Sequence, residues 1–485
     1  MAQQIPFSFF GQGETIATLG SLTMTLTNIE LTNFDTSCEV TDEGGGVVTD
    51  TGICWSTSFN PTIADNFKSS GSGGVGPFTV DILDIDGLLN DTIYYFRAYA
   101  TNLYGQSYSN QVVQTTSYVP LITEWTTAAP GDDINIMRSP AGFNILPINA
   151  YVDWGDGSAI ENVIGNTGST ITHPYAVAGT YEVKISGLFP KISMGSQDEL
   201  IEIKQWGTQP WKDLAGAFDS AHFMNCTATD IPVFSVADLN LRAGFTVMFK
   251  RNTAFGGPFV ANPSFASWDV SGIEEFDQMF RATSFNQDIS SWDMSSATDI
   301  GGMFSFCPLF NQDISGWDVS NVTSFSTLFR LATSFSQNLD SWDTSSGILM
   351  INTFYDASSF AASGSTLSSW DVSNVESMSG LFRQTTGFSS DLSSWDISSV
   401  GTDPLQPNGF SLFMTGLTLL TSDYDAILVG WEATLQSSYP GGVGYTPIPN
   451  IDFGSSQYTL GGPAETARTS LINIYGWTIT DGGGI

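Results

Sequence analysis

Side chains that could carry acid–base or nucleophilic chemistry are scarce in this chain. The sequence holds two histidines, His173 and His222, and it contains no HExxH, GxSxG or phosphate-binding GxxxxGK[ST] pattern. Paired carboxylates could form a glycosidase site, but chance pairs are frequent among 49 acidic residues, and no motif selects one. We therefore expect no enzyme and assign no catalytic or cofactor-binding residue.

The four cysteines give no sign of a metal site or of a disulfide framework. They show no CxxC spacing and no Cys/His cluster, so zinc is not expected. Cys38 and Cys54 could lie on neighbouring strands and form a disulfide, or they could remain free. Cys226 and Cys307 look like small buried apolar residues.

A glycine-rich acidic turn is the next candidate for chemistry. The DWGDG sequence of residues 153–157 looks superficially like a calcium loop. It lacks the alternating oxygen ligands and the late glutamate of such a loop. We interpret it as a tight hairpin whose aspartates bond the local backbone.

A Trp-Asp pair recurs six times and predicts a column of carboxylates from Asp269 to Asp396. On adjacent strands these carboxylates would be about 4.8 Å apart and would repel each other by about 0.9 kcal/mol per step. Two explanations remain open. Each aspartate accepts hydrogen bonds from its own turn, or the column binds a cation or hydroxyl groups. The candidates for Ca²⁺, which is the single cofactor considered, are Asp293, Asp318, Asp343 and Asp371.

These pairs belong to an internal repeat with a period of 24 to 28 residues. The repeated tryptophans are Trp268, Trp292, Trp317, Trp342, Trp370 and Trp395. A phenylalanine follows each of the first five after 12 residues, at Phe280, Phe304, Phe329, Phe354 and Phe382. The in-out-in alternation at Trp-Asp-apolar predicts a strand, and the apolar residues at every third position that follow predict tight turns or an extended return. One unit cannot bury its apolar side alone, so the units should stack around a single core.

The repeat resembles that of the BspA-type leucine-rich-repeat surface proteins, whose strand is followed by V-x-x-I-x-x-x-F and a small residue. LIEIKQWGTQPWKDLAGAF at residues 200–218 looks like the atypical first repeat of that family. YDAILVGWEA near Tyr424 and TARTSLINIYGWTITDGG near the end look like its closing segment. The resemblance covers about residues 190–485. It implies a leucine-rich-repeat solenoid over residues 191–420 and a C-terminal cap over residues 421–485.

Two smaller domains are expected before the repeats. Residues 118–190 contain WGDG followed by HPYAVAGTYEVKI, which resembles a polycystic-kidney-disease (PKD) type β-sandwich. Residues 16–117 contain TIYYFRAYATNLYGQSYSNQ and resemble a fibronectin type III-like β-sandwich. The expected fold class is therefore mainly β, with two β-sandwich domains followed by a leucine-rich-repeat solenoid and its cap.

Residues 1–15 precede these domains and are interpreted as a docking arm. The arm carries three aromatic side chains that no domain of its own can bury, Phe7, Phe9 and Phe10. A partner surface is their natural place of burial.

Composition excludes further classes of function. Lys and Arg total 14 against 49 Asp and Glu, a net charge of −35, which repels phosphate backbones and argues against nucleic acid as a partner. No run of about 18 apolar residues predicts a membrane-spanning helix, so no membrane insertion is expected. No Lys or Arg precedes Lys68, so the basic region of a secretory signal is not seen.

These observations predict a non-enzymatic recognition or adhesion protein. BspA-type proteins are exported bacterial adhesins, whereas a phage virion protein needs no export signal. We therefore expect a virion surface location, as a head fibre, decoration or tail appendage protein. Its expected partners are other virion structural proteins through the N-terminal region and a host surface protein or glycan through the solenoid, and the chain could form a homo-oligomer. The alternative is a secreted adhesin of the BspA type at the bacterial cell surface, and a glycan-binding accessory protein is less favoured.

Overall fold

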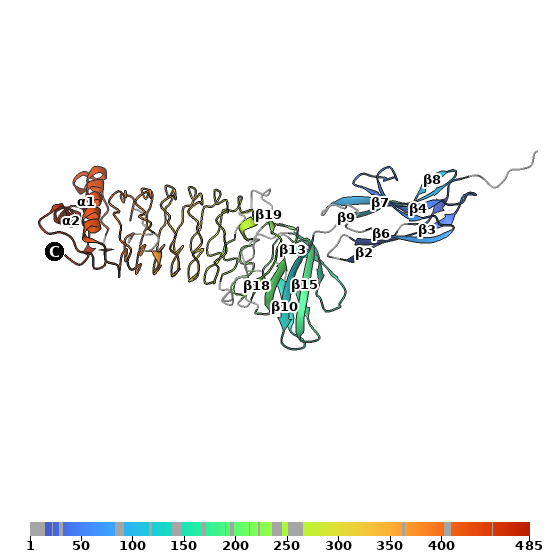
Figure 1. The fold of residues 1–485 in the computed structure, drawn as a ribbon, viewed down its shortest axis with the longest axis horizontal. Helices are drawn as coiled ribbons and strands as arrows, with labels where there is room; N and C mark the ends of the chain where they lie inside the picture. The colour runs from blue at the N-terminus through green and yellow to red at the C-terminus, as the bar shows by residue number, and fades with distance from the viewer. Residues whose placement is uncertain are drawn as a thin grey trace, which may run out of the picture.

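The chain forms an elongated molecule that is mainly β, as its sequence predicts, with helices at its C-terminal end (Figure 1). The structure is a computed structural model. It describes residues 15–21, 23–28, 33–82, 92–115, 119–137, 147–166, 171–189, 191–194, 198–212, 214–221, 224–234, 245–250, 265–360, 364–401, 409–448 and 450–485. The expected docking arm with Phe7, Phe9 and Phe10 lies outside the described residues, as does His222.

The first β-unit, residues 15–115, consists of two antiparallel sheets. One sheet consists of β1 (Thr18–Leu19), β2 (Thr23–Asn28), β3 (Asn33–Asp42) and β6 (Gly76–Ile82). Each of the other three strands is hydrogen-bonded to β3. The other sheet has the order β5-β4-β7-β8 with β9 also on β7, and its strands are β4 (Asp50–Ser56), β5 (Asn66–Gly71), β7 (Ile93–Asn102), β8 (Gly105–Tyr108) and β9 (Val112–Thr115). Cys38 and Val80 of the first sheet share a core with Ile53 and Phe96 of the second, so the sheets pack face to face.

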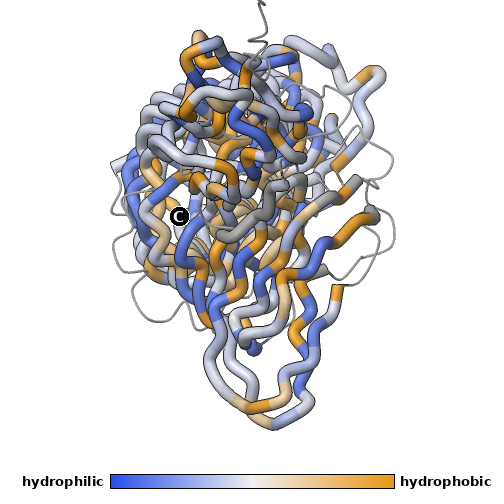
Figure 2. Tube along the Cα trace, turned by 90° about the vertical axis from the view of Figure 1, so that its right-hand side faces the viewer, coloured by the Kyte–Doolittle hydropathy of each residue, from blue (hydrophilic) through white to orange (hydrophobic). Residues whose placement is uncertain are grey.

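The second β-unit, residues 119–189, is built on a larger antiparallel sheet. Its strands are β10 (Leu121–Thr127), β11 (Asp133–Met137), β12 (Pro147–Asp153), β13 (Glu161–Asn166), β14 (Ile171–Pro174) and β15 (Gly179–Leu188). Strands β13, β12, β15 and β10 lie side by side, while β11 and β14 form a separate pair. Viewed along the long axis of the molecule, this unit projects to one side, and hydrophobic and hydrophilic residues alternate along its strands (Figure 2).

The sheet of the second β-unit continues into the repeats. Strand β16 (Leu200–Gln205) pairs antiparallel with β10 and parallel with β18 (Asn225–Cys226). A further parallel pair joins β17 (Pro210–Trp211) to β19 (Val233–Phe234). One hydrophobic core runs from the second β-unit through the repeats to the C-terminal segment. The boundary expected after residue 190 therefore separates strands of a single sheet.

The repeat stack comprises residues 200–417, and from Trp268 on each of its units has a turn edge that contains the Trp-Asp pair. In one central unit the N–H of Trp317 donates to the carbonyl of Ile314 at 3.2 Å, and that of Val322 donates to the carbonyl of Val319 at 2.9 Å. These are bonds between residues three apart, so the Trp-Asp-Val segment lies between tight turns. The strand predicted at this segment is wrong, because the segment forms no ladder with its neighbours. The tight turns predicted for the rest of the unit agree with the bonds between residues three apart.

The opposite side of each unit is a hydrogen-bonded edge, which in the same unit comprises residues 324–331. Alternate N–H groups of this edge donate to carbonyls of the next unit at 2.7 to 2.9 Å, as Phe325 to Leu349, Thr327 to Ile351, Phe329 to Thr353 and Leu331 to Tyr355. Parallel bridges connect the same edges along the stack at Glu275, Asp299, Ser324, Leu349 and Ser377. The units are therefore joined through this edge, on the far side of the core from the Trp-Asp pairs.

The edge needs a left-handed backbone at two positions in each unit. Thr327 and Leu331 have φ values of 58° and 59°, and Gly302 and Gly380 occupy the first of these positions in other units with φ values of 62° and 64°. The two left-handed positions lie four residues apart, and between them the N–H group of every second residue donates to the next unit.

A closing segment, residues 419–485, covers the last unit (Figure 1). It contains α1 (Thr421–Ser438), the short 3₁₀-helix η4 (Pro440–Gly442), β20 (Ile451–Asp452), α2 (Pro463–Asn473) and β21 (Ile479–Thr480). A further 3₁₀-helix, η2 (Phe265–Ser267), precedes the first Trp-Asp pair. Trp431 of α1 is buried, and its indole N–H donates to the carbonyl of Leu392 at 2.9 Å. In the described residues no helix is long and apolar enough to cross a bilayer.

Candidate functional site

The repeated tryptophans form a buried column that joins neighbouring units. They are 1 to 3% exposed, and the rings of Trp292 and Trp317 stack with centroids 6.5 Å apart. From the second unit on, each indole N–H donates to a carbonyl of the unit before it, as Trp292 to Phe265, Trp317 to Ile289, Trp342 to Ile314, Trp370 to Leu339 and Trp395 to Leu367. The phenylalanines of the repeat are equally buried, namely Phe280, Phe304, Phe329, Phe354 and Phe382. Both sets make up the core and leave the surface to other side chains.

The aspartates that follow these tryptophans cap their own turns. In every unit the Oδ1 atom accepts the backbone N–H two residues further on at 2.9 to 3.2 Å, as Asp269 from Ser271, Asp293 from Ser295, Asp318 from Ser320, Asp343 from Ser345, Asp371 from Ser373 and Asp396 from Ser398. The serine bonds lower the pKa of Asp293 and Asp343. These bonds support the first of the two explanations for the column of aspartates, in which each carboxylate accepts hydrogen bonds from its own turn.

The structure does not bring the calcium candidates together into a chelating group. Asp293, Asp318, Asp343 and Asp371 belong to successive units, and each carboxylate is engaged with its own turn. Nowhere in the described ranges do three or more His, Cys, Asp or Glu side chains gather closely enough to hold a metal ion. The arrangement accounts for the repeated aspartates through backbone capping.

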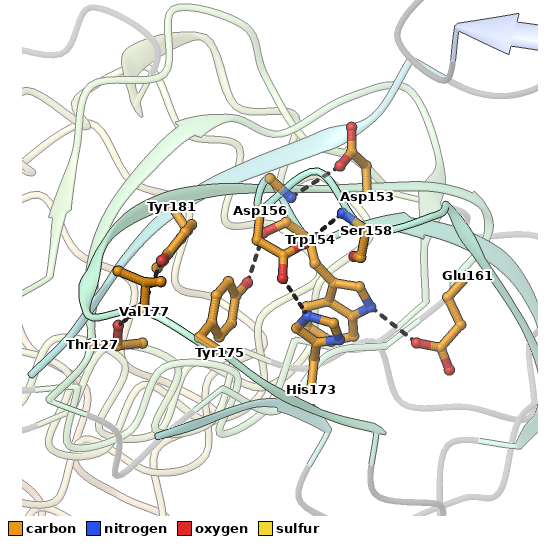
Figure 3. A network of polar contacts seen from close by, with 11 residues as sticks. Thr127, Asp153, Trp154, Asp156, Ser158, Glu161, His173, Tyr175, Val177 and Tyr181 are labelled. Atoms are coloured by element: carbon orange, nitrogen blue, oxygen red, sulfur yellow. Dashed lines mark hydrogen bonds and ion pairs between the residues drawn. The ribbon is translucent and has the colours of Figure 1, made fainter. Parts of the chain in front are cut away.

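The acidic turn of the second β-unit belongs to a compact polar network (Figure 3). Asp153 Oδ1 accepts the N–H of Gly155 and Asp156 Oδ1 accepts that of Ser158, both at 2.9 Å. The other carboxylate oxygen of Asp156 lies 2.9 Å from Nε2 of His173. This contact is the main cause that lowers the pKa of Asp156 to about 2. The aspartates bond the local backbone, as the hairpin interpretation predicts.

Aromatic rings fix the other side of this network (Figure 3). The ring of His173 stacks on that of Trp154 with centroids 4.7 Å apart, and Tyr175 donates its hydroxyl to the carbonyl of Trp154 at 2.7 Å. Gly155 has a φ of 73°, and a Cβ there would lie 2.4 Å from the carbonyl oxygen of Glu182. The turn therefore needs glycine, and His173 ties it to β14, which is a structural role.

Cys38, Cys54 and Cys307 are free thiols, and all four cysteines are buried. Cys38 and Cys54 face different partners, since their thiols donate to the carbonyls of Gly20 and Pro61, each at 3.4 Å. Burial raises the pKa of Cys54 to about 12 and that of Cys307 to about 11, so both remain protonated and unreactive.

A column of alternating arginine and aromatic side chains lies on the hydrogen-bonded edges of five successive units. This Arg–aromatic column consists of Arg281, Phe306, Arg330, Tyr355 and Arg383. The guanidinium of Arg330 lies 4.8 Å from the ring centroid of Phe306 and 5.2 Å from that of Tyr355. The guanidinium of Arg281 lies 5.6 Å from the ring centroid of Phe306, and that of Arg383 lies 4.9 Å from the ring centroid of Tyr355. All five side chains are partly exposed.

The backbone of the stack sets the spacing of this column. Each arginine directly follows the buried phenylalanine of its unit, as Arg330 follows Phe329. The N–H of Phe306 donates to the carbonyl of Arg330 at 2.7 Å, so the bonds that join the units also place a guanidinium beside a ring. Phe306 itself has a φ of 58°, which is unusual for a bulky side chain. The column therefore rests on rigid and partly strained backbone.

The column holds positive charge that no carboxylate neutralises. Between residues 252 and 467 the sequence has no other Lys or Arg than Arg281, Arg330 and Arg383. None of them makes a salt bridge within the described part of the chain, and Arg281 donates instead to the amide oxygen of Gln278 at 2.9 Å. The Nε of Arg383 is buried without a hydrogen-bond partner.

The Arg–aromatic column was not predicted from the sequence because its residues differ from unit to unit. The available signal was that the three arginines occupy the same repeat position, one residue after the phenylalanine, in a stretch that has no other cation. Phe306 could not be recognised as a member of the column from the sequence. It lies two residues after the buried phenylalanine of its unit, Phe304, whereas each arginine lies one residue after its phenylalanine.

One protein-family model matches the repeat region. The family is described as Mycoplasma protein of unknown function, DUF285, and its matches cover residues 184–300, 244–366 and 350–403. They begin in β15 and end before the closing segment, so they span somewhat less than half of the chain. No curated protein matches the chain. The chain is thus similar to a family of surface-repeat proteins whose function is unknown.

Proposed function

We propose that the chain is a non-enzymatic surface recognition or adhesion protein whose repeat stack binds the target. The observation that carries this proposal is the architecture of the stack. Its core is continuous, its backbone is joined from unit to unit, and its long sides offer one outward side chain per unit in fixed register. Extended surfaces of this kind are what solenoid proteins use for binding. The stack is then a BspA-type leucine-rich-repeat solenoid, preceded by fibronectin type III-like and PKD-like sandwiches.

The absence of a catalytic role fits the chemistry of the described side chains. His173 is held between Asp156 and Trp154, and the turn aspartates are engaged with backbone N–H groups. The thiols of Cys38, Cys54 and Cys307 are buried and have raised pKa values, so these three cysteines are poor nucleophiles.

The location that we propose is the surface of a phage virion, as a head fibre, decoration or tail appendage protein. Free thiols support this, because a chain that assembles in a reducing cytoplasm keeps its cysteines unpaired, whereas exported proteins tend to form disulfides. Docking to other virion structural proteins would use the N-terminal region, and the stack would contact a host surface protein or glycan. Neither nucleic acid nor membrane insertion is part of this proposal, and self-association of the chain is compatible with it.

The similarity to the DUF285 family favours a second candidate, a secreted bacterial cell-surface adhesin of the BspA type. In both candidates the stack recognises the target. They differ in whether a virion or a bacterial cell displays the protein. Antibody labelling in electron microscopy and mass spectrometry of purified particles and of washed cells distinguish them. Label on virions supports the first candidate, label on cells without phage supports the second, and label on neither surface overturns the proposed function.

The expected docking arm provides a mutational test of the virion candidate. Removing residues 1–12 should leave the circular dichroism spectrum unchanged, because the described strands begin at Thr18. Incorporation into particles should be lost, since Phe7, Phe9 and Phe10 would supply the apolar contact. Unchanged incorporation would show that docking uses another surface.

A further inference from the structure

The Arg–aromatic column has the properties of a built anion-binding surface. Its guanidinium groups lie against ring faces, so an acceptor can approach them only at their N–H edges, and one N–H of Arg281 already donates to Gln278. Stacking on aromatic rings fixes the orientation of a guanidinium, so less conformational freedom is lost when it binds an anion. A protein with a net charge of −35 could have neutralised these groups with its own carboxylates. In the described structure it does not, although Asp277, Asp299 and Asp356 belong to the same edges.

The spacing of the arginines along the column determines which anions can contact all three of them. Arginines occur at every second unit, and two steps between hydrogen-bonded strands amount to about 10 Å. The ligand must therefore present acidic groups at a regular spacing along a straight line. Such regularity is a property of a polymer with a chemical repeat, and this spacing is comparable to a disaccharide.

The surroundings of the column favour a sugar polymer over other polyanions. Around the arginines the edges carry hydroxyl groups and small residues, including Ser326, Thr327 and Gly380. Short polar side chains next to a flat backbone suit the hydroxyl groups of a polysaccharide. Nucleic acid carries a denser charge, which three arginines on a strongly acidic protein do not compensate.

The acidic turn edge does not prevent this binding. Phe329 packs against Trp342 across the core with centroids 6.4 Å apart. The residues that follow them, Arg330 and Asp343, therefore leave the unit on different sides. At physiological ionic strength charges on the surface are screened over about 8 Å, so the column acts as a local cationic stripe.

We infer that the Arg–aromatic column binds a linear acidic polysaccharide that carries one carboxylate or sulfate group per disaccharide, with the guanidinium edges of Arg281, Arg330 and Arg383 on successive acidic groups. This inference rests on the proposed function as a surface recognition protein, and it names the class of target that the stack takes.

Isothermal titration of the full chain tests the inference with defined polymers. Hyaluronate supplies one carboxylate per disaccharide, κ-carrageenan supplies one sulfate group per disaccharide, and uncharged dextran is the control. We expect binding to at least one acidic polymer, which then identifies the acidic group, no binding to dextran, and weaker binding as NaCl is raised. Failure of both acidic polymers, equal binding of dextran, or binding to duplex DNA or polyglutamate alone would overturn the inference.

Variants separate recognition from a purely structural role of the column. Arg330→Gln should weaken binding by about tenfold or more, because a charge-assisted hydrogen bond is lost, and Arg330→Lys should fall between it and the wild type. The matched control is Arg97→Gln, which removes an arginine that lies 4.6 Å from the ring centroid of Tyr108 in the first β-unit. The combined Arg281→Gln, Arg330→Gln and Arg383→Gln variant should lose binding and retain its circular dichroism spectrum.

The outcomes of the binding measurements on these variants are independent of the labelling experiment that locates the protein on virions or on cells. Equal weakening by Arg97→Gln and Arg330→Gln, or unchanged binding by the combined variant, refutes the role of the column. If the protein is found on a virion or cell surface but binds no acidic polymer, the inference fails and the proposed function stands. If it binds the polymer but is found on neither surface, the proposed function fails and the column is still a glycan site.

Discussion

Replacing Trp317 with alanine tests whether the indole column holds the repeat stack together. Trp317 is 3% exposed in a central unit, and its ring packs 6.5 Å from Trp292 and 6.2 Å from Phe304 between centroids. Removing a buried aromatic side chain of this size costs about 3–5 kcal/mol. The loss should appear as a lower free energy of unfolding in urea, followed by far-UV circular dichroism, because tryptophan fluorescence changes with the mutation itself.

A second variant at the same position isolates the hydrogen bond from the packing. Trp317→Phe retains most of the ring but removes the N–H that donates to the carbonyl of Ile289 at 3.1 Å. An acceptor left unpaired in the core costs about 1–3 kcal/mol. We therefore expect Trp317→Phe to lie between the wild type and Trp317→Ala.

The matched control is Leu309→Ala in the neighbouring unit, because Leu309 is 52% exposed. It should change the free energy of unfolding by less than about 0.5 kcal/mol. Hydrogen exchange should also be faster in Trp317→Ala at the edge that joins Phe329 to Thr353, since each unit is stabilised by its neighbours. If Trp317→Ala lowers the free energy of unfolding no more than Leu309→Ala does, the indole column does not hold the units together and the reasoning is wrong.

Two other predictions concern the end of the stack and the acidic turn. Deleting residues 423–485 removes Trp431 and uncovers the core of the last unit, so the truncated protein should aggregate in light scattering, and a soluble monomer would contradict the capping role. The pKa of Asp156 is lowered from 3.8 to about 2 in the folded protein, so this carboxylate stabilises the fold above about pH 4, and that contribution is lost as the pH falls towards 2. Thermal melts of the wild type should fall more steeply over this interval than those of Asp156→Asn, and parallel curves would show that the contact with His173 contributes nothing.

The period of the repeat and its buried side chains could be predicted from the sequence because both recur. An indole or phenyl ring at the same place in each unit can be buried only if the units stack, and the structure places these rings in one core. The mainly β class, which the structure confirms, was expected from the resemblance of residues 16–190 to β-sandwich domains and of the repeats to a leucine-rich-repeat solenoid. The predicted strand at Trp-Asp-Val was wrong because three residues that alternate in and out fit a pair of tight turns equally well. The hydrogen bonds that the Asp318 carboxylate accepts from the Ser320 N–H and the Val319 carbonyl accepts from the Val322 N–H select the turns.

The hydrogen-bonded edge was harder to predict because two of its residues, four apart in the chain, adopt a left-handed backbone. Its apolar positions do not follow the period of a strand, so its donating N–H groups were not recognised. Glycine at Gly302 and Gly380 was the visible sign of a left-handed position, but Thr327 and Leu331 adopt the same conformation without glycine. The Arg–aromatic column depends on this edge and could not be seen before the register between units was known.

The direction of the unit-to-unit bonds explains why different structures close the two ends of the stack. Along most of the hydrogen-bonded edge, as from Phe325 to Leu331, alternate N–H groups donate to carbonyls of the next unit, whereas at its first residue the Leu349 N–H donates to the Thr323 carbonyl of the unit before. Most carbonyls at the beginning of the stack and most N–H groups at its end therefore need partners from outside the stack. At the beginning Met194 donates to the carbonyl of Ala217 at 2.7 Å, and at the end the carbonyl of Asp452 accepts from Met414 at 2.8 Å. The order of β-unit, stack and closing segment is therefore set by backbone chemistry. Because both ends are closed, ligands are left with the long sides of the stack, where the Arg–aromatic column lies.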